Sequence, residues 1–71
     1  MRREEIKPGV SIRNKKPYDG EGEYLIMGEI NPETLHVPCA MACCDKYPAL
    51  NGQRLELTVW AIEQFYEVVG Q

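Results

Sequence analysis

The sequence predicts a mainly β domain: a small barrel of four to five short strands, with one short helical turn before the last strand. The clearest sign is residues 54–60, where apolar and polar side chains alternate with the period of a half-buried strand. Turn signals separate such segments, among them the Pro- and Gly-rich residues 14–22 and the hairpin dipeptide Asn51-Gly52. With 71 residues the chain is expected to form a single domain, residues 1–71, in which residues 1–7 are a flexible arm.

The first two strands are expected on either side of the polar residues 14–22. Val10 and Ile12 alternate with polar residues directly after Pro8-Gly9, which predicts a half-buried strand. Residues 23–30 (EYLIMGEI) are rich in strand formers and apolar on both faces, so a central strand is expected, with Gly28 marking a bulge.

Residues 35–44 fit two local structures. As a strand they place apolar side chains on both faces; as a helix they begin with Pro38 at the first position, followed by good helix formers. Val37 is a poor N-cap, which favours the strand. In that strand, Pro38 requires an edge position or a bulge because it has no N–H to donate.

The C-terminal segment also has two interpretations. In the first, residues 61–65 form one helical turn and residues 66–69 form the closing strand. In the second, Thr58 caps a helix that runs to Gly70, which would make the domain α+β with a C-terminal helix. Several β-branched residues in this segment argue against the long helix.

The order PGV-I-R, a polar loop, EYLIMGEI and then LTVW-AIEQF-YEVV resembles the layout of SH3-like barrels, including the KOW type. The resemblance covers most of the chain in outline and extends to detail only in LTVWAIEQFYEVV. It implies an architecture and does not imply a function, because one fold hosts many functions.

Charge is unevenly distributed along the chain. Residues 1–16 carry six basic and two acidic side chains, a net charge of +4, whereas residues 17–71 carry two basic and nine acidic ones, a net charge of −7. Arg13, Lys15 and Lys16 lie near Tyr18, a combination that can hold phosphate and stack a base, so an RNA- or DNA-binding barrel is one alternative. The acidic remainder would repel a phosphate backbone and makes nucleic acid the less favoured partner.

Three cysteines and the single histidine lie close together in the sequence, as His36, Cys39, Cys43 and Cys44. Three thiols and an imidazole can form a tetrahedral zinc site, so a Cys/His metal-binding protein is a further alternative. The spacing lacks the usual C-x2-C knuckle, and alternation along a strand would send these side chains to opposite faces. We therefore expect buried, reduced thiols, no cofactor and a cytoplasmic protein.

No motif of an enzyme is present, and no apolar run is long enough to span a bilayer. The sequence is therefore interpreted as a small non-enzymatic binding or adaptor module. Its partner would be another protein or a second copy of the chain, and not a membrane. The residues expected to make contact are Trp60, Tyr66, Tyr47 and Tyr18, because aromatic side chains dominate the energetics of interfaces.

Overall fold

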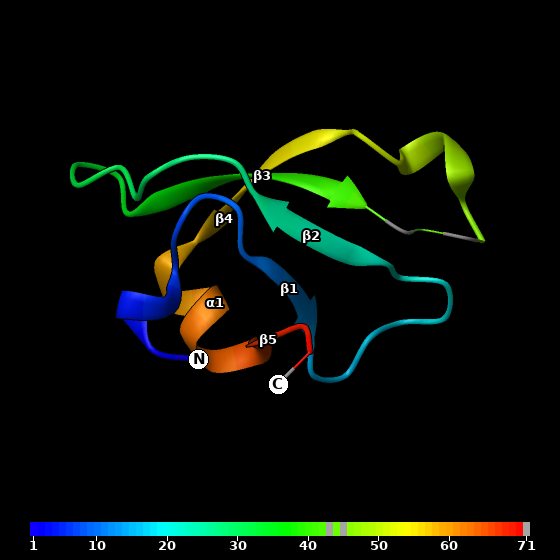
Figure 1. Ribbon diagram of the computed structural model, residues 1–71, viewed down its shortest axis with the longest axis horizontal. Coiled ribbons are helices and arrows are strands. Elements are labelled where there is room, and N and C mark those ends of the chain that lie inside the picture. Colours follow the sequence, from blue (N-terminus) through cyan, green and yellow to red (C-terminus); the bar gives the residue numbers. More distant parts are fainter. Residues whose placement is uncertain (43, 45, 71) are drawn as a thin grey trace.

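The computed structural model describes residues 1–42, 44 and 46–70 and shows a mainly β chain with one antiparallel sheet (Figure 1). The strands are β1 (Ser11–Asn14), β2 (Glu23–Ile26), β3 (His36–Ala42), β4 (Arg54–Thr58) and β5 (Tyr66–Val68), and the helix is α1 (Val59–Phe65). Two short 3-10 turns, η1 (Arg3–Glu5) and η2 (Pro48–Leu50), lie outside the sheet. The predicted mainly β class is confirmed in this form.

The sheet has the order β4-β3-β2-β1-β5. Strands β1 to β4 follow one another as antiparallel neighbours, and α1 then carries the chain from the end of β4 to β5, which pairs with β1 (Figure 1). The first and last strands are therefore neighbours, with Ile12 opposite Val68. The sheet is open in this order, with β4 and β5 at its two edges.

One apolar cluster forms the core. In β3 the buried residues alternate, because successive side chains of a strand point to opposite faces of the sheet. Residues 36–42 thus form a strand, which is the structure that the poor N-cap residue Val37 favoured. The buried members of the cluster are Ile6, Ile12, Tyr24, Ile26, Val37, Cys39, Met41, Val59, Ile62 and Tyr66.

Residues 1–7, expected to form an arm, pack against the rest of the molecule. The amino group of Met1 donates hydrogen bonds to the carbonyl oxygens of Glu63 at 3.1 Å and Tyr66 at 3.3 Å. Ile6 is buried in the core, which accounts for the docking of this segment because burial of an isoleucine side chain contributes about 1.5–3 kcal/mol.

Helix α1 begins where the second interpretation placed its start and ends where the first interpretation placed its end. Thr58 is its N-cap, and the side-chain oxygen of Thr58 accepts a hydrogen bond from the N–H of Ala61 at 3.1 Å. Val59 and Ile62, three positions apart, face the core. The helix ends at Phe65, and Tyr66 takes an extended backbone, so the continuous helix to Gly70 is wrong.

Pro38 lies in the second strand from the β4 edge, and not at an edge as its missing N–H had suggested. Its carbonyl oxygen accepts a hydrogen bond from the N–H of Met27 at 2.8 Å, but proline has no N–H to return the second bond of the pair. The ladder between β2 and β3 ends at this point, after Ile26 opposite Cys39. Strand β2 is therefore shorter than the predicted residues 23–30.

Gly28 lies against the Pro38 ring where β2 ends. A methyl group at Gly28 would lie 2.9 Å from Cγ of Pro38, closer than two carbon atoms pack. We expect Gly28→Ala to lower the free energy of unfolding by about 1–3 kcal/mol, because overpacking forces neighbouring atoms apart. Urea unfolding followed by circular dichroism measures the change.

The matched control is the same substitution in a Pro38→Ala background, where the ring is gone. Gly28→Ala is expected to cost about 1 kcal/mol less there, which a double-mutant cycle reports as a coupling energy. An equal cost in both backgrounds would show that the contact with Pro38 is not the cause.

Candidate functional site

The most exposed large apolar side chains of the described chain include two that touch each other on α1. Trp60 is 64% exposed and Phe65 is 49% exposed. Their rings meet edge to face, with centroids 5.4 Å apart and planes at 81°. The pair faces solvent because Val59 and Ile62 occupy the buried face of the same short helix. Such a pair is suited to contact, since exposed aromatic side chains held in place bind at little entropic cost.

Two lysines lie beside this aromatic pair. The N–H of Lys15 donates a hydrogen bond to the carbonyl oxygen of Phe65 at 2.8 Å, which holds the end of β1 against the end of α1. Asn14 stabilises the turn that follows, because its side-chain oxygen accepts from the N–H of Lys16 at 2.9 Å. The resulting cleft of about 280 Å³ is lined by Asn14, Lys15, Lys16, Gln64 and Phe65. We call Trp60, Phe65, Lys15 and Lys16 the aromatic–lysine surface.

Arg13 does not belong to this surface, because its side chain has a different partner. Its Nε donates to a carboxylate oxygen of Glu67 on β5 at 2.7 Å, as expected from the register that places the two residues opposite each other. Among the described residues, Lys15 and Lys16 have no carboxylate partner within ion-pair distance. The structure thus joins two of the three basic residues to the aromatic pair and engages the third elsewhere.

The other aromatic residues expected to make contact lie apart from Trp60. Tyr47 is exposed in the connector that precedes β4, whereas Trp60 follows the opposite end of that strand. Tyr18 is exposed in the loop between β1 and β2. Tyr66 is only 8% exposed, because β5 turns its side chain into the core; it therefore cannot serve as a surface contact in this structure.

Sequence reasoning missed Phe65 as a contact residue. The sequence carried only part of the signal: within a helix that buries residues 59 and 62, position 60 faces away from the core, but the spacing of five positions from Trp60 to Phe65 is not the three or four that normally bring helical side chains together. The outward direction of position 60 follows from a helix that starts at Val59, as in the second interpretation, and not at Ala61.

Tyr66 packs with Tyr24 around a carboxylate. The two rings meet edge to face with centroids 5.7 Å apart, and the Tyr24 hydroxyl donates to Oε2 of Glu21 at 2.5 Å. The second oxygen, Oε1, is buried and has no hydrogen-bond partner within the described residues. Burial raises the pKa of Tyr24 and of Tyr66, and the Glu21 charge adds to both shifts.

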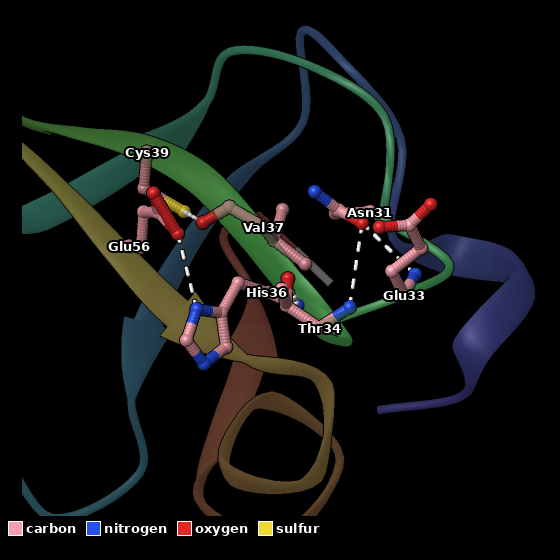
Figure 2. A network of polar contacts seen from close by, with 7 residues as sticks. All are labelled: Asn31, Glu33, Thr34, His36, Val37, Cys39 and Glu56. Carbon is pink, nitrogen blue, oxygen red and sulfur yellow. Dashed lines mark hydrogen bonds and ion pairs between the residues drawn. The ribbon is translucent and has the colours of Figure 1, made fainter.

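The cysteine and histidine residues point to separate partners. The Cys39 thiol is buried and contacts the carbonyl oxygen of Val37 at 3.5 Å, while the Cys44 thiol donates to the carbonyl oxygen of Gly20 at 3.1 Å. Figure 2 shows His36 turned toward β4, where its Nδ1 lies 3.1 Å from Oε2 of Glu56. Within residues 1–42, 44 and 46–70, no three His, Cys, Asp or Glu side chains are placed to hold a metal ion. Cys43, the remaining member of the predicted set, lies outside the described residues.

No family model, curated protein or solved structure matches this chain. In the part of the chain that the structure describes, no helix is long and apolar enough to cross a membrane. The assignment of a function therefore rests on the side chains described above.

Burial predicts slow chemistry at two thiols. It raises the pKa of Cys39 to about 11, so little thiolate exists at neutral pH, and the Cys44 side chain is equally enclosed. In a Cys43→Ser variant, we expect both remaining thiols to react with a disulfide reagent at pH 8 at least 100-fold more slowly than glutathione. Urea should restore the full rate.

Chelator distinguishes burial from metal binding in the same assay on the unmodified chain. If the thiols are protected by packing, their reaction rate is the same with and without chelator. A rate that rises when chelator is added would instead support the zinc alternative.

The shifted tyrosines predict a loss of stability at alkaline pH. Both phenols keep their protons to higher pH in the folded chain than in the unfolded one, so this stabilisation is complete below pH ~10 and is lost as pH rises further. In urea unfolding between pH 9 and 12, Tyr24→Phe should reduce the slope of stability against pH by up to ~1.4 kcal/mol per pH unit.

Tyr66→Phe is the matched comparison. It removes the other shifted phenol and leaves the bond from Tyr24 to Glu21 in place, so it should flatten the slope with a smaller cost at pH 7 than Tyr24→Phe. A wild-type slope in both variants would contradict the assignment.

Proposed function

We propose that the protein is a small non-enzymatic binding module that uses the aromatic–lysine surface to bind a protein segment carrying both apolar and acidic side chains. The observation that supports this most directly is the exposed Trp60–Phe65 pair, fixed on α1 and next to two lysines. Tryptophan is enriched among the residues that carry most of the binding energy in interfaces.

Charge favours an acidic partner segment. Lys15 and Lys16 form the basic flank of the surface, and the cleft beside Phe65 lies between them and the helix. An acidic side chain placed there would meet two ammonium groups, and an adjacent apolar side chain would meet the rings. Each buried aromatic contact contributes about 1.5–3 kcal/mol, which is enough for a weak interaction.

Nucleic acid fits the same surface less well. Arg13, one of the three residues considered for phosphate binding, is paired with Glu67. The net charge of the whole chain is −3, so the parts of a polyanion that extend past Lys15 and Lys16 would be repelled. Single-stranded nucleic acid is therefore an outcome to be tested and is not the proposal.

The same proposal includes an SH3-like small barrel as the architecture. Its support is the antiparallel order that brings β1 and β5 together and the short helix directly before the last strand. A crystal structure in which the sheet curls around the core, while the outer edges of β4 and β5 stay unpaired, would establish such a partly open barrel. Among the described residues, Cys39 and Cys44 are buried and form no disulfide, which agrees with a reducing compartment, so we propose a cytoplasmic location.

Selection from a displayed library of random 12-residue peptides tests the binding mode. We expect selected peptides to combine Leu, Phe or Trp with Asp or Glu. Their affinity should fall at least 30-fold for Trp60→Ala, which corresponds to about 2 kcal/mol. Lys15→Glu with Lys16→Glu should weaken binding about 10-fold, and added salt should reduce that difference.

Trp60 is the single tryptophan of the chain, so its fluorescence reports directly on occupancy of the surface. Emission should shift to shorter wavelength when a selected peptide binds, and Tyr47→Ala, an exposed aromatic change at the other end of β4, should leave the affinity unchanged. Selected peptides that bind Trp60→Ala normally would overturn the proposal. A single-stranded oligonucleotide that binds more tightly than every peptide would replace it with the nucleic-acid alternative.

A further inference from the structure

Strand β4 has a free edge. It stands at the end of the strand order, and its described neighbour is β3 alone. Unpaired strand edges are templates for pairing with another chain, and proteins usually protect them with charges, prolines or bulges. In β4 the sequence is RLELT, with neither proline nor lysine, so the exposed edge is protected only by Arg54 and Glu56.

The register shows which backbone groups are available at this edge. The N–H of Met41 donates to the carbonyl oxygen of Gln53 at 2.9 Å, so Gln53 faces β3. Because the direction of N–H and C=O groups alternates along a strand, the backbone N–H and C=O groups of Leu55 and Leu57 also point toward β3. Arg54 and Glu56 therefore direct their backbone N–H and C=O groups away from β3, toward the free edge.

Antiparallel pairing of β4 with the β4 of a second copy must place outward-facing residues opposite each other. A register centred on Arg54 places Arg54 opposite itself, and one centred on Glu56 places Glu56 opposite itself. Both put like charges face to face, which is destabilising. The register centred on Leu55 instead places Arg54 opposite Glu56 of the second copy, twice by symmetry, and Leu55 opposite Leu55.

The side chains on both faces of the strand suit that register. Leu55 and Leu57 are half-buried at the border of the core, so the second copy's leucine would cover apolar surface that one chain leaves open. On the other face, Glu56 is exposed and bonds His36 through one oxygen, which leaves its second oxygen for an arginine (Figure 2).

We propose that two copies of this chain form a symmetric dimer by antiparallel pairing of their β4 strands about Leu55. The two sheets then continue into one another, and the two-fold axis closes the assembly. The other edge, β5, has three residues and would give an open-ended contact with β4, which makes it the less suitable partner. The contact area is small, so we expect a dissociation constant on the order of 100 µM. This inference does not depend on the aromatic–lysine surface.

Charge reversal tests the register. Sedimentation equilibrium of the wild-type chain from about 10 µM to 2 mM should show a monomer–dimer equilibrium. Arg54→Glu creates two acidic residues on the strand and Glu56→Arg creates two basic ones, so each variant alone should dissociate at least 10-fold more readily. Both positions are exposed, and circular dichroism should show an unchanged fold.

Mixing the two variants gives the decisive control. The two acidic side chains on β4 of one variant would then face the two basic side chains on β4 of the other. The mixture should therefore recover dimer at the wild-type concentration or below. The chain carrying both changes, Arg54→Glu with Glu56→Arg, should also dimerise normally. A wild-type chain that stays monomeric at 2 mM, or variants that do not recover on mixing, would overturn the proposal, as would assembly beyond dimers.

Discussion

Burial of Val59 and Ile62 against the sheet is the contact on which the arrangement of the chain depends. A seven-residue helix is not stable alone, because nucleation costs more than so few hydrogen bonds return. Those two side chains, with the Thr58 cap, hold α1 in place. The helix in turn brings β5 back to β1 and turns Trp60 outward. Core formation and the exposed aromatic surface thus have a common cause.

The sequence predicted the elements with a clear local signal. Alternation identified β4, and the weak N-cap at Val37 correctly favoured a strand for residues 36–42. The length of β2 was not predictable, because it depends on Pro38, a residue of the neighbouring strand. Burial of Tyr66 was also hidden, since the turn that sets its direction is decided by where α1 ends. Prediction of the aromatic–lysine surface required knowledge of both the start and the end of α1. From the sequence, only Trp60 and the two lysines could be named as candidate contact residues.

The edge of β4 illustrates how charge can protect a strand and also specify a partner. Two charges of the same sign at alternate positions would oppose every self-pairing, which is the usual protection of an edge. Arg54 and Glu56 differ in sign, so they oppose the registers centred on either residue and favour the one between them. A pattern of two residues can therefore discourage disordered association and still permit one defined contact.

No residue separates β4 from α1: Thr58 is both the last residue of the strand and the cap of the helix. The strand and the helix are therefore joined without a loop, and we expect a change in the direction of β4 to move α1 with it. A ligand that twists β4 is then expected to displace Trp60 as well, and a ligand that shifts α1 through Trp60 is expected to act on β4. Linkage between two such positions is reciprocal by thermodynamic necessity, so affinity at one end of the joined strand and helix would be reported at the other.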